Sequence, residues 1–351
     1  MSFEDFMGRL DPKTAKRVKV AQQVNLTRLP LASVGLTNAL GGGIGAGRMT
    51  TCYGNYSAGK TVLFLQSIGM WQKMGKVCAF VDAEGTYEKS WGESQGINND
   101  ELILIQSKSS GRIENEITPL IKNGIDAIVI DSISQVLPEI FVDSKTGEMN
   151  SQDSRKQLGA HAKAITALVN GIHYINEKTT VVLLSQTTTF IDPNTGMVKQ
   201  VPHGGQKVPF ASTQMIRLKS SGTEKQQIMG ELQMGDRIVE QPIGRKVEYF
   251  VEKNKLGRQH MKGTYDLYYG GDEVGIDLYG EIIDLAETFG LVKKGGAWYT
   301  DLSTGEQFQG RPKFVKALKS NETLYRSLKG QVEEVLNEQP GGEPEEVDDE
   351  S

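Results

Sequence analysis

The apolar and polar positions of the chain form two alternating patterns, short apolar runs and longer stretches with helical periodicity. Continuous apolar runs of this length are typical of parallel strands buried on both faces. They fall within 49–53, 75–84, 124–132 and 179–186. The stretches with helical periodicity lie between them, at 60–74, 113–122 and 158–176. Strands that alternate with helices in this order predict an α/β fold with a mostly parallel central sheet.

The second half of the chain predicts an extension of this sheet and then a separate small domain. Further strands are expected at 214–218 and 247–251, joined by a segment rich in Gly, Gln and Met, and 263–269 is expected to be the final edge strand. Beyond these strands, helical stretches at 280–289, 312–318 and 324–336 predict a small C-terminal α+β domain.

The two ends of the chain differ in composition from its middle. The polar, basic residues of 1–30 are interrupted by two prolines, which predicts a short helix and a tether. The glycine-rich stretch that ends Leu31–Gly47 is expected to be a flexible approach to the first strand. The expected divisions are an N-terminal segment at 1–30, a main domain at 31–270, a C-terminal domain at 271–337 and an acidic disordered tail at 338–351.

The formal net charge of −5 changes sign once the C-terminal end is set apart. Nine acidic residues and no Lys or Arg occupy 333–351, so the other 332 residues carry a net charge of +4. Such a tail is either a solvated, disordered end or a competitor with an anionic ligand for the basic body. The sequence leaves both interpretations open.

Other classes of protein find little support in the sequence. No apolar run approaches the roughly 20 residues of a membrane span, and the first residues do not form a secretory signal, so we expect a cytoplasmic protein with no membrane partner.

Cys52 and Cys78 lie in apolar, strand-like segments and fit buried thiols. The four histidines, at 161, 173, 203 and 260, show no metal-ligand spacing.

Residues 54–61 form the motif G-x-x-x-x-G-K-T between a predicted strand and a predicted helix. Glycines let backbone N–H groups surround an anion at a helix N-terminus. We therefore expect ATP to bind here, with Lys60 reaching its β- and γ-phosphates and Thr61 ligating Mg2+. The alternative is an ordinary glycine turn before a helix. The expected ATP-binding residues are Gly54, Asn55, Tyr56, Ser57, Ala58, Gly59, Lys60 and Thr61.

Polar residues follow three of the apolar runs, at the strand ends where open parallel sheets bind ligands. Asp82 and Glu84 follow the second run, and Glu84 is expected to activate the attacking water as a general base. The alternative is that these two carboxylates only cap the next helix. Asp131 follows four apolar residues in the Walker B pattern, which places a carboxylate beside Mg2+. Gln186 follows the fourth run and is a candidate sensor of the γ-phosphate.

Two long polar stretches, 138–157 and 187–205, lack periodicity and leave adjacent strands at the same end of the sheet. Ordinary surface loops are the alternative to a binding role for either stretch.

Taken in order, these residues resemble the RecA recombinase family, from about Leu31 to the acidic end. Besides 54–61, the shared motifs are Gly42–Arg48, Ala79–Glu84, Ile128–Ser132, Leu184–Gln186, Lys253–Lys255, Leu278–Leu285 and Gly296–Tyr299. The resemblance implies a RecA-type P-loop ATPase core, an N-terminal helix and tether at 1–30 that pack on the next subunit, and a small C-terminal α+β domain. Bacterial RecA and phage UvsX-like proteins fit equally well.

The resemblance implies five catalytic residues, Lys60, Glu84, Gln186, Lys253 and Lys255. Glu84 would be the catalytic carboxylate, and Gln186 would couple ATP to the second DNA-binding loop. Lys253 and Lys255 would reach ATP bound to the neighbouring subunit, so that hydrolysis would require assembly. Trp91 would lie against the adenine, although a buried structural tryptophan is the alternative.

The resemblance also implies that 138–157 and 187–205 bind DNA. The residues expected to contact DNA are Arg155, Lys156, Phe190, Lys199, Gly204, Gly205 and Lys207. The implied activity is homologous pairing and strand exchange between single-stranded and duplex DNA, by a helical filament with DNA-dependent ATPase activity. Single-strand-binding and mediator proteins are candidate partners. A hexameric ring helicase and a nucleotide-switched regulatory or signalling ATPase share this core and are the alternatives.

Overall fold

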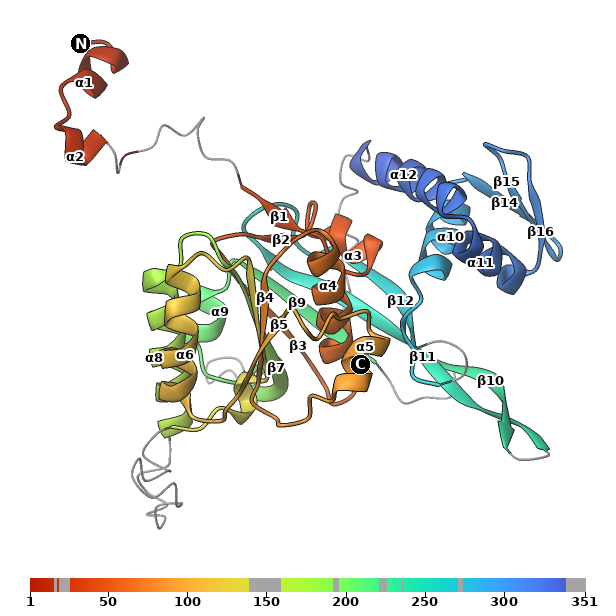
Figure 1. The fold of residues 1–351 in the computed structure, drawn as a ribbon, viewed down its shortest axis with the longest axis horizontal. Helices are drawn as coiled ribbons and strands as arrows, with labels where there is room; N and C mark the ends of the chain where they lie inside the picture. The colour runs from red at the N-terminus through yellow and green to blue at the C-terminus, as the bar shows by residue number, and fades with distance from the viewer. Residues whose placement is uncertain are drawn as a thin grey trace.

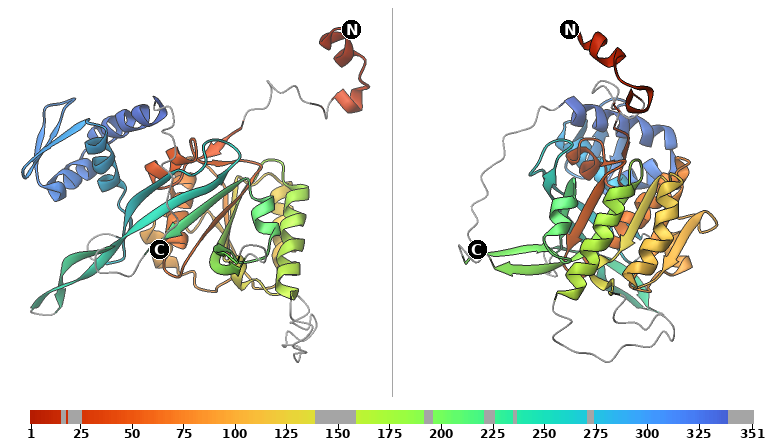
Figure 2. Two further views of the ribbon diagram at one scale, coloured as in Figure 1. Left: turned by 180° about the vertical axis from the view of Figure 1, so that it is seen from behind. Right: turned by 90° about the vertical axis from the view of Figure 1, so that its left-hand side faces the viewer.

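The computed structural model describes residues 1–15, 18, 26–138, 159–191, 196–220, 226–234, 237–270 and 274–338. A large sheet with helices on both faces forms the body, and a small domain of helices and three strands follows it (Figure 1, Figure 2). This architecture confirms the predicted α/β fold with a mostly parallel sheet and a small C-terminal α+β domain.

The main sheet has the strand order β13-β12-β11-β9-β3-β7-β6-β4-β5. Its parallel strands are β3 (Met49–Gly54), β4 (Cys78–Asp82), β5 (Leu102–Gln106), β6 (Ala127–Asp131), β7 (Thr180–Ile191) and β9 (Gln214–Lys219). Every residue of β3, β4 and β6 is buried, which explains why these strands read as unbroken apolar runs. Because the strands run in one direction, the residues that follow them meet at one end of the sheet.

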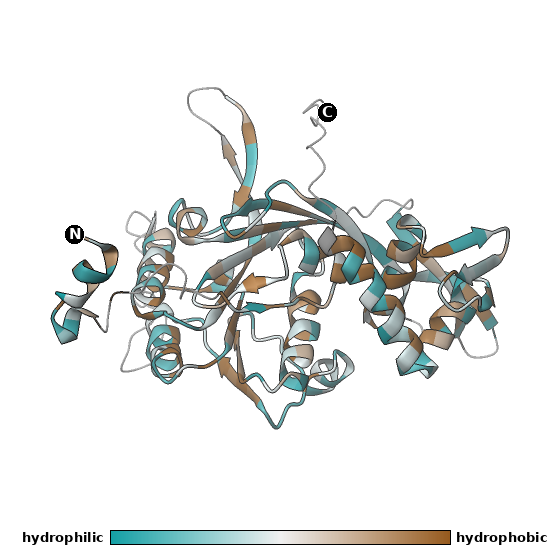
Figure 3. Cartoon of the chain, turned by 90° about the horizontal axis from the view of Figure 1, so that it is seen from above, coloured by the Kyte–Doolittle hydropathy of each residue, from teal (hydrophilic) through white to brown (hydrophobic). Residues whose placement is uncertain are grey.

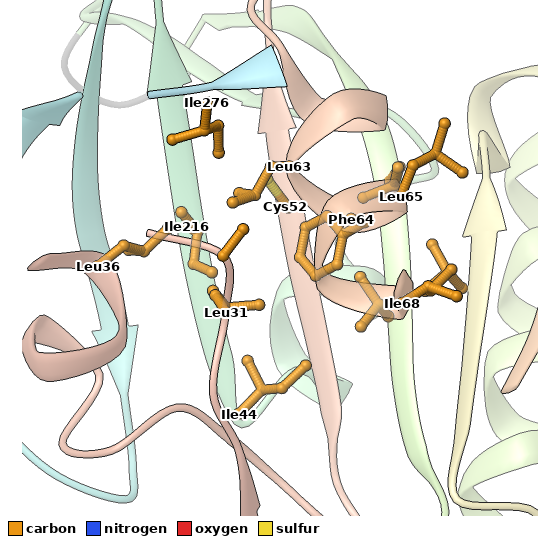
Figure 4. Close-up of a cluster of buried hydrophobic side chains, with 14 of the residues drawn as sticks. Leu31, Leu36, Ile44, Cys52, Leu63, Phe64, Leu65, Ile68, Ile216 and Ile276 are labelled. Atoms are coloured by element: carbon orange, nitrogen blue, oxygen red, sulfur yellow. The ribbon is translucent and has the colours of Figure 1, made fainter. Parts of the chain in front are cut away.

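Helix α4 (Lys60–Lys73) covers one face of the sheet. Its Phe64 and Ile68 are fully buried and belong to the same apolar cluster as Cys52 of β3 and Ile216 of β9 (Figure 4). Full burial of a side chain of this size stabilises the fold by about 1.5–3 kcal/mol. This cluster holds the start of α4, and with it the glycine-rich loop, against the ends of the strands.

Helices α6 (Ser110–Lys122) and α8 (Ala160–Ile175) lie side by side on the opposite face (Figure 1). In α6 an isoleucine recurs at every fourth position, and Ile113, Ile117 and Ile121 are all buried. This spacing places them on one face of the helix, toward the sheet. Figure 3 shows apolar segments both on the strands of the body and on the helices around them.

The stretch 187–205 contains a β-hairpin, so the prediction of an irregular loop was wrong. Strand β7 continues to Ile191 and pairs antiparallel with β8 (Val198–Pro202). The three threonines at 187–189 belong to β7. Threonine is polar but β-branched, and its branched side chain favours strands. The prediction relied on polarity alone and therefore assigned these residues to a loop.

The antiparallel end of the sheet also differs from the prediction. Strand β11 (Arg237–Asn254) is 18 residues long, and β10 (Gln227–Met234) pairs with its first half in a hairpin that extends beyond the sheet (Figure 1). The sequence predicted only a joining segment there, because glycine and glutamine interrupt the alternation expected of strands. Strand β12 (Lys262–Tyr268) is not at the edge, since β13 (Gly275–Ile276) pairs with it.

The N-terminal segment contains two short helices, α1 (Phe3–Gly8) and α2 (Pro12–Ala15), neither of which has a buried residue. Strand β1 (Arg28–Leu29) follows them and pairs antiparallel with β2 (Ile44–Gly45). Helix α3 (Val34–Ala39) lies between the two strands in the chain.

The glycine-rich approach to β3 is well packed, so the expectation of a flexible segment was wrong. A side chain on Gly43 would lie 2.2 Å from the carbonyl oxygen of Leu29, and one on Gly47 would lie 2.2 Å from that of Glu177. Both glycines have positive φ angles, 115° and 68°. They are required where two backbones touch, not where the chain must move.

The C-terminal domain packs three helices against a small antiparallel sheet. The helices are α10 (Leu278–Thr288), α11 (Arg311–Ser320) and α12 (Glu322–Glu338), and the strands are β14 (Val292–Gly295), β15 (Trp298–Asp301) and β16 (Gln307–Gln309). Phe314 is fully buried in its core and stacks on Phe308, with ring centroids 4.2 Å apart. Val34 of α3 belongs to the same cluster and joins the domain to the body.

Glu281 of α10 is buried where the C-terminal domain meets α3. Its carboxylate accepts hydrogen bonds from the Ser33 hydroxyl at 2.6 Å and from the backbone N–H groups of Val34 at 3.0 Å and Gly35 at 3.1 Å. Burial raises the pKa of Glu281 from 4.5 to about 7, although these donors favour the charged form.

We expect the folded protein to become less stable as the pH rises from about 4.5 to 7, because of Glu281. In that window the folded protein holds a proton on Glu281 that the unfolded chain releases, so stability falls with increasing pH. Compared with Glu281→Gln, the wild type should lose about 3 kcal/mol of unfolding free energy between pH 4.5 and pH 7.5. Urea unfolding of both proteins at the two pH values measures the difference, and parallel pH dependences would contradict it.

The first predicted loop, 138–157, lies outside the described residues apart from Pro138, as does the acidic end from 339. Arg155 and Lys156 are therefore not placed. Within the described part of the chain, no helix has both the length and the apolar character needed to cross a membrane.

Candidate nucleotide-binding site

The glycine-rich loop connects the end of β3 at Gly54 to the start of α4 at Lys60. Gly59 has a φ angle of 85°, and a side chain on Gly54 would lie 2.2 Å from the Leu218 carbonyl oxygen. Both positions therefore require glycine. The structure has the strand, loop and helix in the order that the motif predicted, with the unpaired N–H groups of the first turn of α4 at the loop.

The Lys60 ammonium group is buried and folds back onto the loop. It donates hydrogen bonds to the carbonyl oxygens of Gly54 and Asn55, at 2.9 Å each. Burial lowers the pKa of Lys60 below its ordinary value, while the nearby Asp131 and Glu84 oppose that shift. Because a buried charge whose acceptors are neutral carbonyls gains from a nearby anion, this environment suits a phosphate.

Thr61 and Asp131 meet at the start of α4. The Thr61 hydroxyl donates to Asp131 Oδ2 at 2.6 Å. Asp131 is only 6% exposed, and burial raises its pKa to about 6 despite the Thr61 donor. Hydroxyl and carboxylate oxygens are the ligands that Mg2+ prefers. The two side chains therefore fit a divalent cation, which would favour the charged form of Asp131.

The register of β4 and β6 brings Glu84 to this pair. The two strands run parallel with Asp82 opposite Asp131, and Glu84 lies two residues beyond the end of β4. The hydroxyl of Ser132, the residue after Asp131, donates to Glu84 Oε1 at 2.9 Å. Glu84 is half-buried. A carboxylate next to a candidate cation site, held by a neutral donor, is suited to accept a proton from water.

Asp82 does not act alongside Glu84 but fixes the turn that carries it. Its carboxylate accepts hydrogen bonds from the backbone N–H groups of Gly85, Thr86 and Tyr87, at 2.7, 3.1 and 2.9 Å. Although burial opposes the shift, these donors hold the pKa of Asp82 below its ordinary value. The next helix along the chain begins at Lys89 and is capped by Glu88, so Asp82 does not cap it.

The backbone of Gln186 joins the nucleotide end of the sheet to the hairpin. Gln186 lies opposite Gly54 in the ladder between β3 and β7. Its N–H donates to the Ser134 hydroxyl oxygen at 2.9 Å, and its carbonyl accepts from the His203 N–H at 3.0 Å. The sequence analysis did not predict a role for Ser132 or Ser134 in the site. A serine that follows a strand does not indicate a binding role until its neighbours across the sheet are known.

Lys253 and Lys255 lie at the other end of the sheet from their own glycine-rich loop. The backbone N–H of Lys255 donates to the Thr213 carbonyl, and that of Thr213 donates to the carbonyl of Met49, where β3 begins. Met49 and Gly54 are five residues apart, which spans about 16 Å in a strand. The structure therefore does not bring Lys253 and Lys255 to the loop of the same chain. The Lys253 ammonium donates to the Pro209 carbonyl at 2.6 Å, and Lys255 is exposed.

Trp91 lies beside the apolar cluster of α4, whereas Phe190, Lys199 and Gly204 lie in the β7–β8 hairpin or directly after it. Trp91, in α5 (Lys89–Ser94), is half-buried and packs against the apolar cluster of α4, and its contact with adenine stays a prediction. Phe190 and Lys199 are exposed and lie opposite each other in the hairpin. Gly204 is buried with a φ angle of 113°.

Gly204 and its neighbours connect the hairpin to α9 (Lys207–Ala211). A side chain on Gly204 would lie 3.0 Å from Ile165, so internal packing accounts for this glycine. Gly205 is exposed and Lys207 is half-buried. Their contact with DNA stays a prediction.

Comparison with known proteins agrees with the motifs. The family model for the RecA N-terminal domain matches residues 12–274, and that for the RecA C-terminal domain matches residues 280–337. Protein RecA of Pseudomonas savastanoi pv. phaseolicola is 33% identical over 315 residues, covering 87% of this chain and 80% of the relative. Protein RecA of Chlorobaculum tepidum is 30% identical over 318 residues, covering 88% and 83%. The chain therefore belongs to the RecA family of recombinases.

Proposed function

We propose that this chain is a DNA-dependent ATPase that forms helical filaments on single-stranded DNA and exchanges strands with homologous duplex DNA. One observation carries the proposal, the set of contacts made by residues 131–134. Asp131 contacts Thr61, Ser132 contacts Glu84, and Ser134 contacts Gln186. The strand that carries Gln186 continues into the predicted DNA-binding hairpin. These hydrogen bonds and strand β7 can therefore transmit a change at the nucleotide to the predicted DNA-binding hairpin.

In this proposal the loop residues 54–61 bind the phosphates of ATP, and Trp91 lies against the adenine. Mg2+ would be held by Thr61 and Asp131 and would neutralise charge on the β- and γ-phosphates. Glu84 positions the attacking water and takes its proton. The Lys60 ammonium leaves the loop carbonyls and stabilises the charge that develops on the γ-phosphate. Gln186 responds to the presence of that phosphate.

The active site is completed by a second copy of the chain. Lys253 and Lys255 cannot serve their own loop, since they lie at the far end of the sheet, so they would act on ATP bound to the adjacent subunit. Such a contact joins two different surfaces and generates an open helix when it does not close into a ring. Helices α1 and α2, whose side chains are not buried in their own chain, would bind the neighbouring subunit.

DNA would bind along the hairpin and the residues that follow it. Lys199 and Lys207 would neutralise phosphates, Phe190 would stack on a base, and the backbone at 204–205 would approach the strand closely. Arg155 and Lys156 of the first loop would add further phosphate contacts. Recognition of this kind holds the backbone and leaves the choice of sequence to base pairing.

Hydrolysis of ATP with and without single-stranded DNA, combined with negative-stain images of the same mixtures, tests this proposal. We expect DNA to stimulate hydrolysis, filaments to form with ATP, and affinity for DNA to fall steeply with salt. Hydrolysis that ignores DNA, from rings or monomers, would instead support a helicase or a regulatory ATPase built on the same core.

A further inference from the structure

Two histidines meet where α8 approaches the end of the hairpin. His161 is the second residue of α8, and His203 follows β8 directly. Their ring centroids are 4.6 Å apart and the ring planes are inclined by 58°. Neither residue belongs to the nucleotide site described above.

Each ring carries a buried nitrogen that lacks a hydrogen-bond partner among the described residues, Nε2 of His161 and Nδ1 of His203. Leaving a buried polar atom unpaired is costly, so such atoms call for an explanation. A ring nitrogen without a hydrogen-bond partner can present its lone pair to a metal ion, and imidazole nitrogens are common metal ligands.

The surroundings of His161 favour its neutral form. Burial lowers its pKa below the ordinary value, and the neighbouring His203 lowers it further. A neutral imidazole is the form that binds metals. It is also the form that attracts an anion least, so the same environment argues against a phosphate as the ligand.

The separation of the rings matches coordination to one ion. A metal–nitrogen distance of about 2.1 Å and an angle of about 90–109° between the ligands place two imidazole centroids about 4.5–5.2 Å apart. The observed 4.6 Å lies within that range. Among the described residues no group of three or more His, Cys, Asp and Glu side chains is suited to a metal, so water would complete the coordination.

We propose that His161 and His203 together bind one late first-row divalent cation of the Zn2+, Ni2+ and Cu2+ class. These ions favour imidazole, whereas Mg2+ favours oxygen ligands, so the site is distinct in chemistry from that of Thr61 and Asp131. The bound ion links α8 to the residue whose N–H donates to the Gln186 carbonyl. It thereby holds the base of the hairpin in place. The metal site itself does not depend on the proposed function.

Titration of the full chain with Cu2+, without nucleotide, DNA or a polyhistidine tag, tests the proposal by electron spin echo spectroscopy. We expect one tightly bound equivalent whose echo modulation shows two imidazoles. His161→Asn and His203→Asn should each remove one imidazole and weaken binding by at least about 10-fold. His173→Asn, which changes an exposed histidine on the same helix, should leave both unchanged.

The wild-type spectrum alone can overturn the proposal, without reference to the folding of any variant. A count of one imidazole or none at the tight site would contradict it. So would an unchanged spectrum in folded His161→Asn and His203→Asn proteins, or loss of the tight site in His173→Asn.

Discussion

Glu84→Gln should lower the rate of ATP hydrolysis by about 10²- to 10⁴-fold, the usual contribution of a general base. The amide keeps the shape of the side chain and can still accept the hydrogen bond from Ser132, but it cannot take a proton from water. ATP binding should be retained, because Glu84 is not among the groups that hold the phosphates. The steady-state hydrolysis rate and the affinity for ATP, measured on the same preparation, separate the two effects.

An exposed carboxylate elsewhere provides the control for this prediction. Glu101→Gln makes the same chemical change at an exposed position and should leave hydrolysis unchanged. Full hydrolysis by Glu84→Gln would remove the general base from the account and favour a nucleotide-switched regulator. Loss of ATP binding in Glu84→Gln would show that the carboxylate shapes the loop instead.

Lys255→Ala should lower DNA-stimulated hydrolysis by at least about 10²-fold, since cationic groups supplied by a neighbour contribute about 10³–10⁵ in related phosphoryl transfers. The Lys255 side chain is exposed, so its removal should not disturb the fold. Lys253→Ala should have a similar effect but also breaks the hydrogen bond to Pro209. Binding of ATP by the isolated subunit should be unchanged in both variants, because both lysines lie far from their own loop.

Lys122→Ala is the matched control, because Lys122 is exposed on α6 on the outer side of the molecule. Its rate should equal that of the wild type. A Lys255→Ala protein that hydrolyses ATP normally on DNA would contradict a role for this lysine in the site.

The sequence predicted the features that depend on local order. Glycine at positions 54 and 59, Lys60 and Thr61 lie within eight residues, so the motif and its strand and helix could be read together. Buried strands could be recognised as apolar runs for the same reason. The β7–β8 hairpin was missed because the threonines that build it are polar, and only their branching indicates a strand.

Contacts between distant segments could not be read from the sequence. Ser132 and Glu84 are 48 residues apart and meet only because β4 and β6 are neighbours in a particular register. The role of Asp82 depended on three N–H groups whose direction the turn sets. Similarly, His161 and His203 belong to different elements, and no spacing along the chain predicts that their rings meet.

An active site shared between subunits is the central claim, and mixing two inactive variants tests it most directly. In an equal mixture of Glu84→Gln and Lys255→Ala, a Lys255→Ala subunit supplies an intact Glu84, and a Glu84→Gln neighbour supplies an intact Lys255. Random assembly along one filament should make about one quarter of the contacts complete, with about one quarter of the wild-type hydrolysis rate on DNA. A mixture no more active than the sum of its separate components would contradict the account, because each site would then lie within one chain.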